Sequence, residues 1–170
     1  MDKKSVCAMF TGSFDPVTLG HEDIIRRAAA LFDRLYVTAF INKDKEGLFP
    51  PALRLAFLEK VCADLPNVTV CRDDGMVADF VTREGIDLIV RSVRGAADAD
   101  YERTMADYNK EKCGVETLLF CADPRLAHIS STAVREALLR GEDAHGLLPA
   151  CIWEDVAKNL QSLQKKTNKD

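Results

Sequence analysis

Near its start the chain carries the stretch TGSFDPVTLGH, Thr11 to His21, in which a glycine, hydroxyl and proline turn leads to a histidine. Gly12 lets the backbone approach a ligand closely, and Ser13 offers a hydroxyl and an N–H. His21 stands where an amphipathic run begins, and the amino end of a helix attracts anions through its unpaired N–H groups and its dipole. The stretch therefore indicates a phosphate site; the alternative is a tight turn with a helix cap and a solvated histidine.

Two widespread phosphate-binding motifs are absent from this stretch. It lacks GxxxxGK[ST], which excludes a P-loop, and it lacks GxGxxG, which excludes the dinucleotide fingerprint. Any phosphate bound by this stretch must therefore be held by a different arrangement of helix ends and cations.

The elements that must position these residues read as strands and helices in alternation. Strands are expected at 5–10, 35–41, 67–72, 86–91 and 115–122, and helices at 21–34, 51–65, 76–85, 98–112, 130–141 and 151–166. This order predicts an α/β fold with a Rossmann-like five-stranded parallel sheet and helices on both faces. We expect a single domain over 1–170, with a C-terminal helix and basic tail from about 150. Ligands of such sheets bind beyond the carboxyl ends of the strands.

Composition limits the partners. The 170 residues are 47% hydrophobic and 29% charged with a net charge of −4, so no global basic field favours nucleic acid or an anionic membrane. No apolar run approaches the roughly 18 residues of a membrane span. The six cysteines are scattered, mostly among apolar neighbours and without zinc-ligand spacing, which favours reduced, buried thiols and a cytoplasmic protein.

Four motifs in order carry a resemblance to a known family. They are GSFDPVTLGH, RSVRG at 91–95, DADYE at 98–102 and HISSTAVRE at 128–136. With this spacing the chain, from Cys7 to about Leu148, resembles the phosphopantetheine adenylyltransferase family of the T/HxGH nucleotidyltransferase superfamily.

The resemblance implies a reaction. AMP would pass from ATP to 4′-phosphopantetheine, giving dephospho-coenzyme A and pyrophosphate, by direct in-line attack without a covalent enzyme intermediate. It also implies Mg²⁺ bound with ATP and not by protein side chains, coenzyme A as a possible feedback ligand, and a homohexamer built as a dimer of trimers. The physical demand is to hold two anions in line and to stabilise charge on the α-phosphate.

The resemblance also assigns residues. His21, Lys45 and Arg94 match catalytic positions, and Lys43 is the rival of Lys45 if the loop alignment shifts. The phosphopantetheine side would be bound by Ser13, Lys45, Val77, Arg91 and Asn109. The ATP side would be bound by Ser13, Phe14, Thr18, His21, Ser92, Val93, Arg94, Glu102, Leu126, His128, Ile129, Ser130, Ser131 and Thr132.

The chain departs from the family pattern at a few positions. Thr11 stands where proline is usual, Leu19 where asparagine is common and Ser92 where glycine is usual. Leu126 and His128 occupy a stretch where aromatic residues are common. The first three leave the phosphate chemistry intact, whereas the last two put the fit around the adenosine in doubt.

Three other functions are alternatives to adenylyl transfer to phosphopantetheine. Nicotinate mononucleotide adenylyltransferases and cytidylyltransferases generally carry histidine at the position of Thr18. A non-catalytic nucleotide-binding module would need no cations facing the ATP site, and the presence of Lys45, Arg91 and Arg94 alongside His21 favours catalysis.

Overall fold

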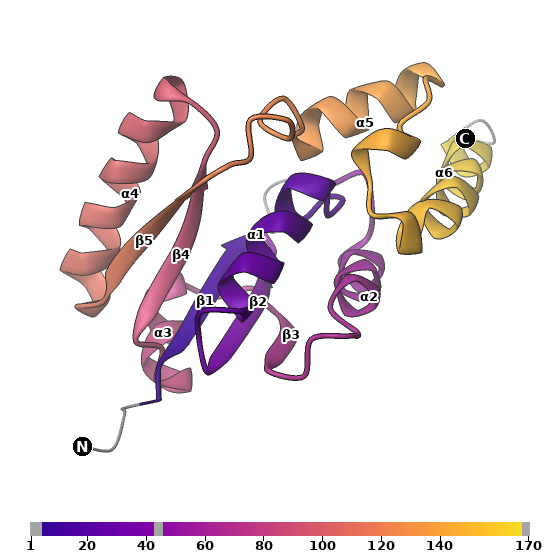
Figure 1. Ribbon diagram of the computed structural model, residues 1–170. Helices are drawn as coiled ribbons and strands as arrows, with labels where there is room; N and C mark the ends of the chain where they lie inside the picture. The colour runs from indigo at the N-terminus through magenta and orange to yellow at the C-terminus, as the bar shows by residue number, and fades with distance from the viewer. Residues whose placement is uncertain (1–4, 43–45, 168–170) are drawn as a thin grey trace.

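The computed structural model describes residues 5–42 and 46–167, and these contain a five-stranded parallel sheet in the order β3-β2-β1-β4-β5 (Figure 1). The strands are β1 (Cys7–Gly12), β2 (Arg34–Phe40), β3 (Val68–Asp73), β4 (Leu88–Val93) and β5 (Glu116–Cys121). The helices are α1 (Leu19–Ala29), α2 (Pro51–Val61), α3 (Val77–Glu84), α4 (Ala96–Cys113), α5 (Ser131–Arg140) and α6 (Trp153–Thr167), with 3-10 turns η1 (His145–Leu147) and η2 (Ala150–Ile152). The predicted fold class is confirmed.

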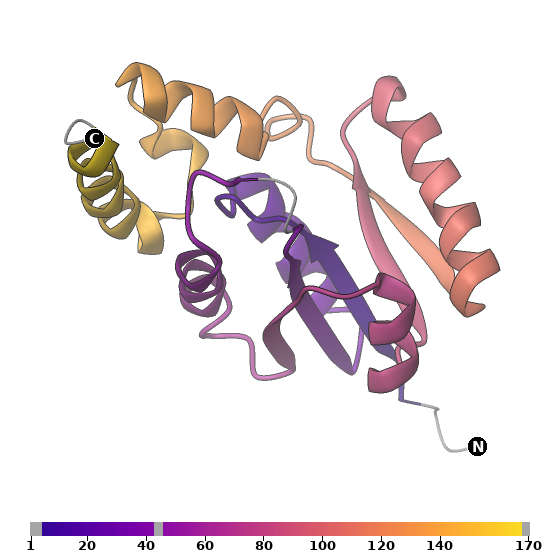
Figure 2. The same ribbon diagram turned by 180° about the vertical axis from the view of Figure 1, so that it is seen from behind.

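Each face of the sheet is covered by its own helices, as the two opposite views show (Figures 1 and 2). Successive side chains of β1 point to opposite faces. Ala8 and Phe10 pack into the larger core, which includes buried residues of α1, α2 and α5. Cys7 and Met9 pack into a smaller core with Phe80 of α3. The central strand is thus buried on both sides, which explains why its sequence is almost wholly apolar.

The ends of α5 follow from local chemistry. The Ser130 hydroxyl accepts a hydrogen bond from the Ala133 backbone N–H at 3.0 Å, which satisfies one unpaired donor of the first turn. The helix stops at Gly141, whose φ of 72° is the left-handed conformation that glycine adopts without strain. Both ends are those expected from the sequence.

Two predictions about the chain are corrected. The fourth strand runs two residues further than Arg91, because Ser92 and Val93 continue the pairing with β5. Ser92 and Val93, which were expected to lie after the strand, are therefore part of it, and Arg91 lies in the strand as predicted. The cysteines are also less uniformly buried than expected, since Cys121 and Cys151 are exposed.

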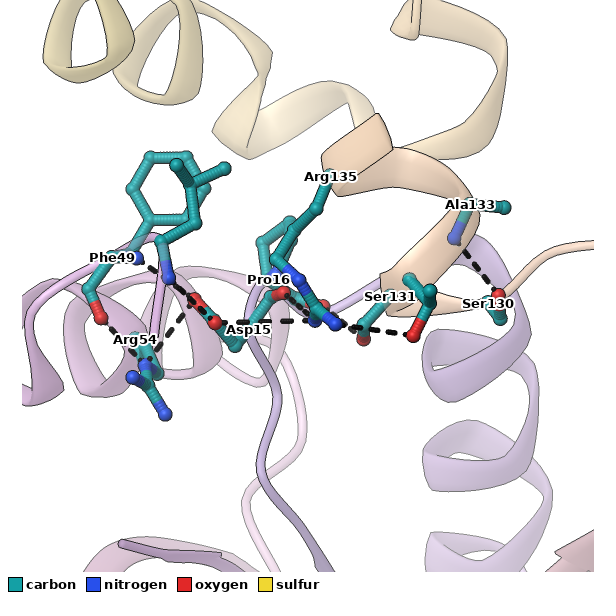
Figure 3. A network of polar contacts seen from close by, with 10 residues as sticks. Asp15, Pro16, Phe49, Arg54, Ser130, Ser131, Ala133 and Arg135 are labelled. Carbon is teal, nitrogen blue, oxygen red and sulfur yellow. Dashed lines mark hydrogen bonds and ion pairs between the residues drawn. The ribbon is translucent and has the colours of Figure 1, made fainter. Parts of the chain in front are cut away.

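A buried carboxylate anchors the turn between β1 and α1 (Figure 3). Asp15 is 4% exposed, and its two oxygens accept the backbone N–H groups of Leu48 and Phe49 at 2.8 and 2.9 Å. The Arg54 guanidinium lies 3.3 Å from the same carboxylate and donates to the Phe49 carbonyl at 2.6 Å. A Cβ at Gly47 would lie 1.7 Å from this guanidinium, so only glycine fits there. The turn and the segment before α2 are thereby fixed to each other.

The opposite side of the same turn is tied to α5. Arg135 donates to the Asp15 carbonyl at 2.8 Å, and the Ser131 hydroxyl donates to the Pro16 carbonyl at 2.8 Å (Figure 3). Both side chains come from the first turns of the helix. The beginning of α5 is thus held against the turn that precedes α1.

Among residues 5–42 and 46–167, none of the helices combines the length and the hydropathy that a membrane crossing requires.

Replacing Asp15 tests the anchor. Asp15→Ala leaves the buried Arg54 guanidinium without its carboxylate and is expected to lower the free energy of unfolding by about 3–5 kcal/mol. Denaturation with urea measures this loss. Asp123→Ala is the matched control, because it removes a carboxylate from an exposed pair with Arg125, and it should lower stability far less. Equal effects of the two substitutions would contradict the anchoring.

Candidate nucleotide-binding site

A cavity of about 320 Å³ lies at the carboxyl ends of β1 and β4. Its walls also include the first turns of three helices, α1, α4 and α5. This is the place where parallel α/β sheets bind ligands, because the two strands on either side of the crevice lead into helices on opposite faces. The volume falls in the range of small-molecule sites.

His21 is built into the first turn of α1 and lines this cavity. Its Nδ1 accepts the backbone N–H of Thr18 at 3.1 Å and lies 3.0 Å from the Thr18 hydroxyl. The Thr18 hydroxyl in turn accepts the backbone N–H of His21 at 3.4 Å. Because Nδ1 is an acceptor, the neutral imidazole carries its proton on Nε2. His21 is therefore both half of a capping box and a hydrogen-bond donor available to a ligand.

The surroundings of His21 keep it neutral. Burial first of all, together with the positive charges of Arg94 and Arg91, lowers the pKa of His21 to about 4. The ring packs edge-on against Phe14, with 5.1 Å between the ring centroids. Phe14 itself has a φ of 45°, which is rare outside glycine, and its side chain is fully buried. Strained backbone next to the ring is the kind of feature that accompanies functional sites.

Two arginines line the cavity, Arg91 in β4 and Arg94 directly after it, and each is paired with a carboxylate of α4. Arg91 donates to both oxygens of Glu102 at 2.7 and 2.8 Å and to the Thr11 carbonyl at 3.0 Å. Arg94 donates to both oxygens of Asp98 at 2.8 and 3.2 Å, and this pairing lowers the pKa of Asp98. The two cations are held in fixed orientations, which suits the recognition of phosphate oxygens.

The structure brings together most of the residues expected from the resemblance. Those that line the cavity are Ser13, Thr18, His21, Arg91, Ser92, Arg94, Glu102, Leu126, Ile129, Ser130, Ser131 and Thr132.

The remaining predicted residues lie apart from the lining. Phe14 lies beneath His21 in the core, and Val77 packs against the smaller core beside α3. Asn109 is buried on α4. Val93 and His128 are likewise absent from the lining. Lys45 and its rival Lys43 lie outside the described residues.

Among the lining residues that were not predicted, two are charged. Arg135 is the third arginine of the cavity, and it donates to the Thr132 hydroxyl at 3.1 Å as well as to the Asp15 carbonyl. Asp98 pairs with Arg94 as described. Arg135 stands inside the motif HISSTAVRE, three residues after Thr132, and that helical spacing is the signal that places both on one face.

Within the described ranges, no group of three or more histidine, cysteine, aspartate or glutamate side chains gathers as a metal site. The two carboxylates that line the cavity, Asp98 and Glu102, are each paired with an arginine.

The protonation of His21 gives a pH prediction. The unfolded chain binds this proton with a pKa near 6.5 and the folded protein with a pKa of about 4, so the unfolded state holds more protons between these values. The contribution of His21 to stability is therefore complete above pH 6.5 and is lost as the pH falls towards 4. ¹⁵N NMR of the ligand-free protein should show Nδ1 unprotonated and a midpoint near 4. A midpoint near 6.5 would contradict the assignment, and in His21→Gln the stability should fall less steeply over the same interval.

Among solved structures, the fold is similar to that of a putative nicotinate-nucleotide adenylyltransferase from Vibrio parahaemolyticus. The TM-score is 0.61 with 20% sequence identity, and the match covers 92% of this chain and 99% of that one. At this identity the likeness concerns the fold alone.

Sequence relatives are closer. The Cytidylyltransferase-like family matches residues 9–137. Proteins named phosphopantetheine adenylyltransferase are 42% identical over 145 residues in Cutibacterium acnes and 42% identical over 147 residues in Porphyromonas gingivalis. A third, from a Nocardioides species, is 44% identical over 145 residues. These matches cover 85, 86 and 85% of this chain and 92, 95 and 91% of the respective relatives. The chain belongs to the phosphopantetheine adenylyltransferase family, whose members are nucleotidyltransferases.

Proposed function

We propose that the protein transfers AMP from ATP to 4′-phosphopantetheine, giving dephospho-coenzyme A and pyrophosphate. The family membership supports the adenylyl transfer and the acceptor. The observation that carries the proposal is the state of His21. It is a neutral imidazole at the start of α1, its ring proton is on Nε2, and its neighbours in the cavity are Arg91 and Arg94.

The reaction balances without a proton acceptor. An oxygen of the acceptor phosphate attacks the α-phosphorus of ATP and forms the new P–O bond. The bond from the α-phosphorus to the bridging oxygen breaks, and pyrophosphate leaves with that electron pair. Because the nucleophile is already an anion, a general base has nothing to remove. This fits His21, whose Nδ1 is occupied by Thr18 and whose low pKa disfavours protonation.

His21 would therefore act as a donor. Its Nε2–H would bond to a non-bridging oxygen of the α-phosphate, where negative charge increases as the bonds rearrange. The N-terminus of α1 adds the partial positive charge of its dipole at the same point. A fixed donor of this kind requires no reorganisation during the reaction.

The other cations would place the two anions. Arg91 would hold the acceptor phosphate and Arg94 the ATP phosphates, while the first turn of α5 with Ser130 and its hydroxyl neighbours would receive the β- and γ-phosphates. Arg135 adds a positive charge at that helix start. Lys45, for which the resemblance implies a bridge between acceptor and ATP, completes the proposed set.

Magnesium would enter as the ATP complex. Since Asp98 and Glu102 are paired with arginines, the ligands of the ion would be phosphate oxygens and water, which Mg²⁺ readily retains. The lining thus fits a metal brought by the substrate. When bound, the ion neutralises charge on the leaving pyrophosphate.

Two further proposals concern regulation and assembly. Coenzyme A contains the pantetheine and adenylate parts that the site would join, so it should compete with both substrates in inhibition kinetics.

We also propose a homohexamer. Leu118 and Leu119 on the edge strand β5 are exposed, at 42% and 38%, which is compatible with burial against another copy. Sedimentation equilibrium distinguishes a hexamer from a monomer.

The acceptor is tested by pyrophosphate release from MgATP, with 4′-phosphopantetheine and nicotinate mononucleotide offered in parallel. The proposal expects turnover with phosphopantetheine alone. Turnover with the mononucleotide alone would keep the phosphate chemistry and overturn the acceptor. No pyrophosphate release with either substrate, in a protein that still binds ATP, would favour a non-catalytic nucleotide-binding module.

His21→Ala tests the donor. Loss of a hydrogen bond made to the transition state should lower kcat by about 100-fold or more. KM should change much less, because the ground state gains little from this bond. His145→Ala is the control, since His145 is exposed and packs on Trp153 away from the cavity. Near-normal turnover of a folded His21→Ala protein would remove His21 from the mechanism.

A further inference from the structure

We propose that Glu102 is a positioning residue that acts on the acceptor phosphate through Arg91. The identity of the acceptor rests on the proposed function above. The positioning itself rests on the geometry of the cavity.

The carboxylate of Glu102 faces Arg91. Both of its oxygens accept from that guanidinium, one from Nε at 2.7 Å and the other from a terminal nitrogen at 2.8 Å. The Glu102 side chain is only 10% exposed, whereas that of Arg91 is 26% exposed. Of the two partners, the arginine therefore presents more surface to a ligand in the cavity.

Arg91 keeps the donors that a phosphate needs. A guanidinium has five N–H bonds, and three of them are used by the two Glu102 oxygens and the Thr11 carbonyl, which leaves two. The two that remain are on the terminal nitrogens, because Nε is already engaged. Their directions are fixed by bonds on two sides, one to α4 and one to the end of β1. Arg91 is thus oriented before the ligand arrives, and binding loses less side-chain freedom.

The charge of Glu102, taken alone, would have the opposite effect. Glu102 places a negative charge beside a site for anions, so its removal would strengthen phosphate binding if electrostatics alone decided. If Glu102 orients Arg91, its removal weakens phosphate binding, because an oriented guanidinium is lost. The two expectations differ in sign, which makes the proposal testable.

Asp98 shows that the pairing is not an isolated contact. It lies four residues before Glu102 on α4 and receives Arg94 through the same two kinds of nitrogen, at 2.8 and 3.2 Å. This second pair is more open, with Arg94 42% and Asp98 28% exposed. One face of α4 therefore supplies the partner of both Arg91 and Arg94, and the Arg91–Glu102 pair is the more buried of the two.

The experiment compares KM values for the two substrates in Glu102→Gln. An amide replaces one accepting oxygen by a donor that opposes the guanidinium, so KM for phosphopantetheine should rise about ten-fold, the effect of one lost charge-assisted hydrogen bond. KM for ATP should change less than about two-fold. A rise confined to ATP, or tighter binding of the acceptor, would overturn the proposal. If Glu102→Gln does not fold, Glu102→Asp, which keeps the charge and shortens the side chain, decides by the same two constants.

Glu142→Gln is the matched control. Glu142 receives Arg140 through Nε and a terminal nitrogen at 2.8 and 3.3 Å, but the pair is exposed and outside the cavity. Both KM values should stay unchanged in this variant. A similar rise in KM in both variants would mean that loss of any such pair disturbs the protein, and the proposal would fail.

A second measurement needs no substrate. In ligand-free wild-type protein the Nε–H of Arg91 should exchange slowly with solvent in ¹⁵N–¹H spectra, and Glu102→Gln should accelerate that exchange while leaving the signal of Arg94 unchanged. Unchanged exchange at Arg91 would show that Glu102 does not hold it. This outcome is independent of which acceptor the enzyme uses, so it separates a failure of the positioning from a failure of the proposed function.

Discussion

The buried carboxylate of Asp15 is the constraint on which the site depends. The turn between β1 and α1 must present backbone and side chains to a ligand, so it cannot be held by regular secondary structure. It is held by Asp15, which binds the segment before α2 on one side, while the Asp15 carbonyl receives Arg135 of α5 on the other. A buried ion pair of this kind contributes little net stability, but a mismatched partner would cost several kcal/mol, so one arrangement of the three segments is strongly preferred. That arrangement sets the start of α1 and with it His21.

A second constraint is the balance of charge around His21. Positive charge is needed to bring two phosphate-bearing substrates together, yet the same charge and the same burial lower the pKa of the imidazole. The result is a neutral donor surrounded by cations. A neutral imidazole still donates a hydrogen bond, and its orientation is fixed by the Thr18 cap, so the site gains a directed N–H without one more full charge to desolvate.

The fold could be predicted because its signal is local. Apolar runs bounded by turns gave five strands, and the helices between them required parallel pairing. The ends of strands were less certain, since the polar Ser92 suggests that the strand stops at Arg91, whereas pairing with β5 keeps Ser92 and Val93 in β4. Most lining residues could be found because they cluster in four short motifs. The ion pair between Asp15 and Arg54 could not be predicted, because the two residues come from distant segments and no sequence feature of either segment indicates that they pair.

The role of α4 shows why a motif match does not by itself assign a function to each residue. The segment DADYE supplies three acidic side chains, and the resemblance alone assigns Glu102 to the nucleotide. In the folded chain the helix turns two of these carboxylates, Asp98 and Glu102, towards Arg94 and Arg91 at the end of β4. An arginine that binds a phosphate needs its guanidinium held in one orientation, and the sheet fixes only the position of the arginine backbone. The orientation comes from the neighbouring helix, so the acidic segment and the basic strand end form one functional unit although each is recognised separately in the sequence.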